Sequence, residues 1–235
     1  MPSGTDMLTQ DAFAPNYDSN GSLGPEYGVL SRDRWSMFPW MFNGYTQLLA
    51  RVHRFGSVDA QKQPIRPFVD NPRIIEYFSS TKGNIQDETA PWCSAFVNWC
   101  FARAGIAGTR DPAAKSWLGW PGGRRLSNIR PIIGSVVVFP RQGGGHVEMV
   151  WHTFPDGSID VLGGNQGVQR ARLGLHPWDF VPGIPTHVSI GHHKCNEALG
   201  YVWPNDYPLP NESDAKDLIQ LADLTIPPEL RPNPR

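Results

Sequence analysis

The stretch Asp87-Glu88-Thr89-Ala90-Pro91-Trp92-Cys93-Ser94-Ala95-Phe96-Val97-Asn98-Trp99 places a cysteine where a turn leads into an apolar segment of helical period. Side chains at the spacing of one helix face follow, namely Cys93, Phe96, Val97, Cys100 and Ala104. This spacing predicts a helix that runs from Cys93 to Ala104 and ends at Gly105. The free N–H groups and partial positive charge at a helix N-terminus stabilise a thiolate and lower the pKa of a thiol there. Cys93 is therefore the candidate nucleophile of this chain.

His146 lies far downstream, after three glycines at 143–145 and at the start of a segment that predicts a strand. Successive side chains of a strand point to opposite faces, so His146 and Glu148 share the more polar face, opposite an apolar face that we expect to join the core. A thiol nucleophile needs a base that takes or shares its proton. The position of His146 makes it the candidate base.

The base in turn needs a third group that holds its ring, and the end of the next predicted strand, Leu162-Gly163-Gly164-Asn165-Gln166, can supply it. An amide oxygen accepts the N–H of an imidazole, so Asn165 is the first candidate and Gln166 the second. Glu148 is interpreted as a neighbour that tunes the charge of the site. Trp92, directly before the nucleophile, is a further auxiliary candidate.

Helix signals come first along the chain and strand signals afterwards, which is the pattern of an α+β domain. Asn71-Pro72 and Asp111-Pro112 each combine a helix-capping residue with a proline at the first helical position. Helices are expected over 35–55, 72–80, 93–104 and 112–118. Strands are expected over 135–139, 147–153, 158–162 and 198–203.

Composition divides the chain into three segments. Residues 1–32 are expected to be a flexible acidic arm, residues 33–204 one domain, and residues 205–235 a proline-rich acidic tail. The tail contains Leu218, Ile219, Leu221 and Leu224 at near-helical spacing. A short helix over 215–224 would dock on its own domain or contact a partner. The connection 166–197 is expected to form a lid or wall of the site.

Several function classes are disfavoured by the composition. No apolar run approaches the roughly 20 residues that span a bilayer, and the N-terminus lacks the pattern of a secretory signal. Three cysteines make no disulfide framework, and Cys100 is expected to be a buried small hydrophobic residue. Gly191-His192-His193-Lys194-Cys195 lacks a second cluster at matched spacing, so it is interpreted as a polar loop and no metal or other cofactor is expected.

Charge is spread unevenly along the chain. The two flanking segments together hold 4 basic and 10 acidic residues, and residues 33–204 hold 17 basic and 12 acidic residues. A modestly basic body suits an anionic polymer, and ordinary scatter of surface charge explains it as well. Nucleic acid is not expected as a partner.

Taken together, the motifs resemble one family of enzymes. Those motifs are PWCSAFVNW (91–99), GSVVVF (134–139), GGHV (144–147) and LGGNQ (162–166), with NPRIIEY (71–77) and LGYVWP (199–204) around them. The chain resembles papain-like bacterial cell-wall hydrolases, the NlpC-type peptidases and CHAP amidases, over about residues 69–204. The resemblance is to a subgroup found in phage lysins and antibacterial toxins.

The resemblance implies a papain-like α+β fold, with the nucleophile at a helix N-terminus packed on a small antiparallel sheet. It implies Cys93 as nucleophile, His146 as base and Asn165 as the polar third member, in an enzyme that cleaves amide bonds of peptidoglycan without a metal. Three positions depart from the family pattern, and the first is Ser135, at a place where the family often has an acid. Gly163 stands where an acidic residue is often found, and Glu148 stands where a small residue is common.

The expected substrate is the stem peptide of peptidoglycan. The protein is expected to be made in the cytoplasm without a signal peptide and to act in the periplasm or cell wall of a target bacterium. It would be either a toxin delivered by a type VI-like secretion system or a phage-type lysin. A delivered toxin would have a secretion-machine component and an immunity protein as partners. The alternatives are a papain-like acyltransferase or deamidase acting on a protein, and an inactive binding module.

Overall fold

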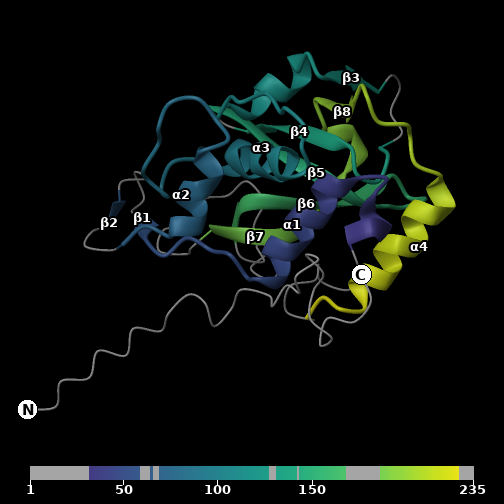
Figure 1. Ribbon diagram of the computed structural model, residues 1–235, viewed down its shortest axis with the longest axis horizontal. Helices are drawn as coiled ribbons and strands as arrows, with labels where there is room; N and C mark the ends of the chain where they lie inside the picture. The colour runs from purple at the N-terminus through teal and green to yellow at the C-terminus, as the bar shows by residue number, and fades with distance from the viewer. Residues whose placement is uncertain are drawn as a thin grey trace, which may run out of the picture.

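The computed structural model describes residues 32–58, 64–65, 69–126, 131–141, 143–167 and 186–227, and it has an α+β fold (Figure 1). The expected arm at 1–32 therefore lies outside the described residues except for Arg32. The helical elements are η3 (Arg32–Trp35), α1 (Pro39–Leu49), α2 (Pro72–Phe78), α3 (Cys93–Arg103), η4 (Ala114–Gly119), η6 (Cys195–Glu197) and α4 (Glu212–Asp223). The strands are β1 (Ser57–Val58), β2 (Pro64–Ile65), β3 (Gly123–Arg125), β4 (Val136–Arg141), β5 (Gly144–Thr153), β6 (Ser158–Gly167), β7 (Thr186–Lys194) and β8 (Gly200–Pro204).

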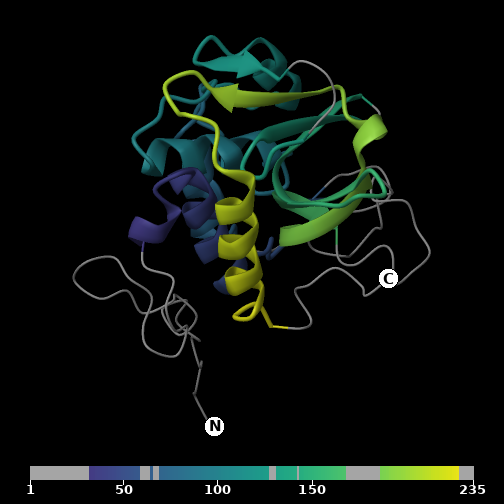
Figure 2. The same cartoon turned by 90° about the vertical axis from the view of Figure 1, so that its right-hand side faces the viewer.

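Six strands form one antiparallel sheet in the order β3-β8-β4-β5-β6-β7. In the centre of the sheet β5 pairs with β4 on one side, where His146 lies opposite Phe139, and with β6 on the other, where Met149 lies opposite Leu162. The α-helices gather on one side of this curved sheet (Figure 2). The expected papain-like arrangement, with α3 packed on the sheet, is thus present.

The period of two in the strands separates two cores. In β4, Val136 and Val138 join the main core beneath the helices, and Val137 and Phe139 join a smaller cluster on the other face. The same alternation in β5 sends Val147, Met149 and Trp151 into the main core, as expected. The opposite face of β5 was expected to be polar, but it is also buried. His146 and Glu148 therefore lie inside the protein.

Proline decides where two of the helices begin. A proline lacks the backbone N–H and clashes with the preceding turn, so it fits the first helical position and breaks a helix interior. α2 begins at Pro72 after an Asn71 cap, as predicted. The helix predicted over 35–55 is present but shorter, because the α-helix starts only at Pro39 and ends at Leu49. The predicted helix over 112–118 is the 3₁₀ helix η4.

The connection at 166–197, predicted to form a lid or wall of the site, contains a strand that the sequence did not predict. Its last part is β7, which pairs with β6 along the edge of the sheet. Its middle part, 168–185, lies outside the described residues. β6 itself is five residues longer than the predicted strand and carries an irregular register between Gly163 and Gln166.

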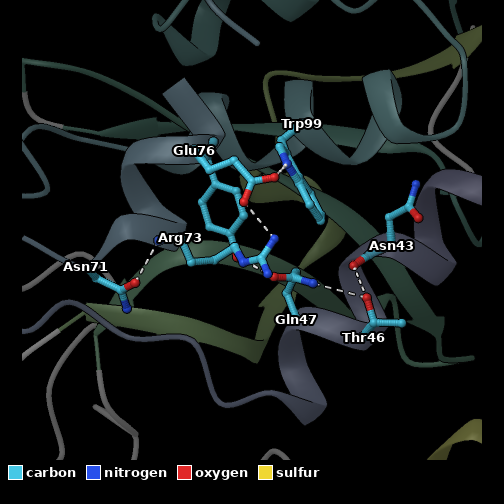
Figure 3. Close-up of polar contacts among 8 residues, drawn as sticks. Asn43, Thr46, Gln47, Asn71, Arg73, Glu76 and Trp99 are labelled. Atoms are coloured by element: carbon cyan, nitrogen blue, oxygen red, sulfur yellow. Dashed lines mark hydrogen bonds and ion pairs between the residues drawn. The ribbon is translucent and has the colours of Figure 1, made fainter. Parts of the chain in front are cut away.

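Polar side chains tie the three main helices together behind the start of α3 (Figure 3). Glu76 on α2 accepts a hydrogen bond from the Trp99 indole on α3 at 3.0 Å and pairs with Arg73 at 2.7 Å. Gln47 on α1 accepts one from the hydroxyl of Tyr77 at 3.0 Å. Each bond crosses between elements or closes a helix turn, so α2 is fixed against both α1 and α3.

The predicted helix in the tail is α4, and it docks on its own domain. Ala215, Leu218, Ile219 and Ala222 are buried, and Asp223 accepts a hydrogen bond from the Trp151 indole at 2.9 Å. The same carboxylate lies 2.6 Å from His152 Nε2. No helix in the described ranges is both long and apolar enough to cross a membrane.

β6 passes unusually close to the first turn of α3. A Cβ built on Gly164 would lie 2.5 Å from the Trp92 ring and 2.8 Å from Phe96 Cβ. Real Cβ atoms do not approach so closely, so only glycine fits at this position without movement of strand or helix. The contact fixes the distance between the sheet and the residue that opens α3.

A Gly164→Ala substitution is expected to lower the free energy of unfolding by about 1–3 kcal/mol, because it overpacks this contact. Gly119→Ala is the matched control, since a Cβ there has no atom within 4 Å. Urea unfolding should show a lower midpoint for the first variant only, with an unchanged m-value. Equal midpoints for the two variants would contradict the tight contact.

Candidate active site

Cys93 is the first residue of α3, and Trp92 is its N-cap without a side-chain hydrogen bond to the cap. The N–H groups of the first helical turn are therefore not consumed by a capping side chain and favour a negative charge. The Cys93 side chain is buried, with 2% of its surface exposed. A charge-stabilising helix end and a desolvated thiol thus meet at one residue.

The residues on either side of Cys93 are firmly held. Glu88, fully buried, accepts hydrogen bonds from the backbone of Gly56 and from Asn71 N at 2.6 Å. Ser94 Oγ donates to the carbonyl of Asp111 at 2.7 Å and accepts from the Trp117 indole at 3.1 Å. These bonds join distant segments of the chain, so the start of α3 is fixed before any substrate binds.

His146 lies at the start of β5 with 3% of its surface exposed. Its Nε2 is 3.4 Å from Oε1 of Glu148, two residues along the same strand face. The other charged neighbour of its ring is Cys93, and the backbone N–H of Val147 acts on the same sulfur. The structure therefore brings together the predicted nucleophile and the predicted base.

Opposite charges stabilise each other in this pair. Burial, the largest effect, raises the pKa of the Cys93 thiol. The charge and hydrogen bond of His146, the Val147 N–H and the charge of Arg141 outweigh it and lower the pKa below the ordinary value. Burial likewise lowers the pKa of His146, but the negative charges of Glu148 and Cys93 raise it to about 9. The favoured state is a thiolate beside an imidazolium.

Glu148 also contacts a second imidazole. Its Oε2 lies 3.5 Å from Nε2 of His193 on β7, and the side chain of His193 is 3% exposed. Burial lowers the pKa of His193, against the opposing effect of the Glu148 charge. Sequence reasoning missed His193, because β7 was not recognised and the residue was assigned to a polar loop.

The other predicted site residues surround this group. Asn165 has a positive φ of 60° in the irregular part of β6, and its side chain makes no hydrogen bond to any described residue. The orienting contact predicted for it is therefore not made here, and Glu148 faces His146 Nε2 instead. Gln166 is held by Ser189, with hydrogen bonds of 3.0 Å in both directions. Trp92 is fully buried against Tyr77, with ring centroids 5.9 Å apart.

The remaining cysteines have different environments. Cys100 is fully buried, and burial raises its pKa well above the ordinary value. Cys195 is partly buried, and its pKa is also raised by burial. In the part of the chain that the structure describes, no group of three or more His, Cys, Asp or Glu residues could hold a metal ion. Of the three thiols, only Cys93 has a lowered pKa.

Comparison with known proteins identifies the domain that contains these residues. Residues 85–165 match the family model of the CHAP domain. The chain carries a CHAP domain. It is accordingly a cysteine peptidase or amidase of the class that acts on peptidoglycan, in agreement with the resemblance of its motifs. The matched segment runs from the turn before Cys93, through the strand of His146, to Asn165.

A solved structure of the wild-type endolysin LysIME-EF1 is similar to the chain with a TM-score of 0.36 and 13% sequence identity. The alignment covers 65% of this chain and 84% of the endolysin chain. No curated protein sequence matches.

Removal of the His146 ring is expected to slow alkylation of Cys93 by iodoacetamide at pH 7 by about tenfold or more, because a loss of one pKa unit of thiolate stabilisation is a factor of ten in thiolate population. The measurement is peptide mass spectrometry over time in wild type and His146→Ala. His53→Ala is the control, since this exposed ring lies on another segment. An unchanged alkylation rate in His146→Ala would contradict the ion pair.

Proposed function

We propose that this protein cleaves amide bonds in the stem peptides of peptidoglycan, with Cys93 as nucleophile and His146 as general base. The observation that supports it most is the position of Cys93 at the N-terminus of α3 beside His146, within the segment that matches the CHAP domain. A lowered thiol pKa next to a raised imidazole pKa is the electrostatic arrangement that a cysteine hydrolase needs.

The reaction begins with attack of the Cys93 thiolate on the carbonyl carbon of the scissile amide. The C–S bond forms as the carbonyl electrons move to oxygen, and the backbone N–H of Cys93 donates to this oxyanion. As the tetrahedral intermediate collapses, the C–N bond breaks and the His146 imidazolium gives its proton to the leaving amine. The products of this half-reaction are a free amine and a thioester on Cys93.

Water completes the cycle. Neutral His146 takes a proton from a water molecule, whose oxygen attacks the thioester carbon. The C–S bond then breaks, a carboxylic acid is released, and the thiolate–imidazolium pair returns. Both half-reactions use only groups of this chain and water, so the proposed chemistry requires neither cofactor nor metal.

Arg141 gives the proposed site a positive edge. Its charge acts on Cys93 from the end of β4. Lys115 lies close to the same edge, since a Cβ built on Gly145, the residue before His146, would be 3.0 Å from the Lys115 side chain. Stem peptides carry free carboxylates, which such cations attract. This favours peptidoglycan over a neutral substrate.

The biological setting belongs to the same proposal. We propose a role as an antibacterial toxin delivered to the periplasm or wall of a target cell, with a phage-type lysin as the second candidate. A producing cell would then need an immunity protein that covers Cys93, and delivery would need a secretion-machine component. Asn165 remains a predicted polar member of the site, and Gln166 and Trp92 remain auxiliary candidates.

Incubation of isolated peptidoglycan with the purified protein is expected to release soluble fragments, and Cys93→Ala is expected to release none above background. Cys195→Ala should keep wild-type activity, because that thiol lies outside the site. Mass spectrometry of the fragments shows which bond is cut and so separates an endopeptidase from an amidase.

Equal release by wild type and Cys93→Ala, or no release by either, would overturn the hydrolase proposal. An acyltransferase or deamidase would instead leave the polymer intact and change the mass of a protein substrate in a Cys93-dependent manner. Retention on peptidoglycan without release would identify a binding module.

A further inference from the structure

The Glu148 carboxylate is completely buried at the back of the His146 ring. Neither of its oxygens has a hydrogen bond to any described residue. The carboxylate oxygens lie close to two imidazole nitrogens, Nε2 of His146 at 3.4 Å and Nε2 of His193 at 3.5 Å. A buried carboxylate without a cationic partner is costly, so this environment demands a positive charge on one of the two rings.

The surroundings decide which ring carries that charge. His146 faces the Cys93 thiolate on α3 as well as Glu148, and two negative neighbours favour its imidazolium. His193 faces the charges of His146 and His192, both of which oppose its protonation, and its own burial does so more strongly. Glu197 acts in the opposite direction, with an oxygen 3.7 Å from His193 Nδ1. The positive charge therefore resides on His146, and His193 stays neutral.

A neutral His193 still restrains the carboxylate. Its ring packs against Phe139 of β4, a member of the smaller core cluster, with ring centroids 4.4 Å apart. This contact fixes the direction in which Nε2 points, so it meets one oxygen of Glu148 while the other oxygen faces His146. One carboxylate is thus held between two strands, β5 and β7.

Glycine on the neighbouring strand provides the room. A Cβ on Gly163 of β6 would lie 2.7 Å from Cγ and 2.8 Å from Oε1 of Glu148, and 2.8 Å from Nε2 at the flexible end of Gln166. No side chain at position 163 fits while Glu148 holds this conformation. The volume beside His146 can therefore hold a side chain from position 148 of β5 or from position 163 of β6, but not both. In this chain it holds the side chain of Glu148.

We propose that Glu148 is the positioning residue of this site: it supplies the carboxylate that orients His146, in space that Gly163 leaves open, with its second oxygen fixed by His193. The inference rests on the proposed function, in which His146 serves Cys93. It assigns to Glu148 the role for which an amide of β6 was the first candidate, and it gives His193 and Gly163 supporting roles.

Glu148→Gln tests the role of the charge, because it keeps the shape of the side chain. The readout is the pH dependence of Cys93 alkylation, which needs no peptidoglycan. The midpoint for Cys93 should move to higher pH, by about 1–3 units, since an imidazolium without its carboxylate is a weaker partner for the thiolate. His193→Asn should move the midpoint in the same direction by less.

Asp160→Asn is the matched control. It removes a carboxylate from another histidine contact of the same sheet, Asp160 with His192 at 2.7 Å, without touching His146. It should leave the Cys93 midpoint in place. An unchanged midpoint in a folded Glu148→Gln protein, or an equal shift in Asp160→Asn, would overturn the proposal.

Relocation of the carboxylate tests position. Glu148→Ala should slow alkylation of Cys93 at pH 7 at least tenfold, and the double variant Glu148→Ala/Gly163→Glu should recover most of it, because the new carboxylate enters the same space from β6. A double variant that melts at the wild-type temperature and recovers nothing would overturn the proposal. Where wild type shows the expected thiolate but no peptidoglycan fragments appear, the proposed function fails and the role of Glu148 stands.

Discussion

The contact between the first turn of α3 and the centre of the sheet sets the geometry on which this site depends. Gly164 lets β6 approach Trp92 and Phe96 without an intervening side chain. At this separation the sulfur of Cys93 reaches both the ring of His146 and the backbone N–H of Val147. A single methyl group in that contact would move the helix away from the strand that carries the base.

Burial strengthens the electrostatic interactions among the groups that this geometry brings together. The thiol, the imidazole and the carboxylate all have less than 4% of their surface exposed, so each charge is felt strongly by the next. None of the three is well placed alone: burial by itself raises the pKa of Cys93 and lowers the pKa of His146. Side by side, the three groups favour alternating charges. The carboxylate and the thiolate are negative, and the imidazolium between them is positive. The helix N-terminus adds to the same preference.

Local patterns in the sequence predicted much of this arrangement. Asn71-Pro72 predicted the start of α2, and the apolar period after Cys93 predicted α3 almost to the residue. The Cys93–His146 pair followed from the setting of each residue. Its contact with the sheet could not be predicted from spacing, because it depends on how closely β6 approaches the helix.

Other features were beyond local patterns for physical reasons. β7 alternates Val188 and Ile190 with polar residues and a glycine, which gives a weak strand signal, and its pairing with β6 is long-range. Asn165 was expected to hold the ring of the base from the end of the neighbouring strand, but it has a positive φ in an irregular part of β6. Glu148 was interpreted as a charge neighbour because it lies only two residues from His146 along the same, more polar face of β5. A second small core covers that face and makes its carboxylate a buried partner of His146.

The central claim is that resting enzyme holds a thiolate beside a protonated His146. The most direct measurement is a pH titration of the His146 ring by nitrogen-15 NMR, with the signal assigned by its absence in His146→Gln. The account predicts a midpoint near 9 in wild type and a lower midpoint in Cys93→Ala, where the thiolate charge is missing. A midpoint at or below the ordinary value of about 6.5 in wild type would show a neutral thiol–imidazole pair and contradict the account.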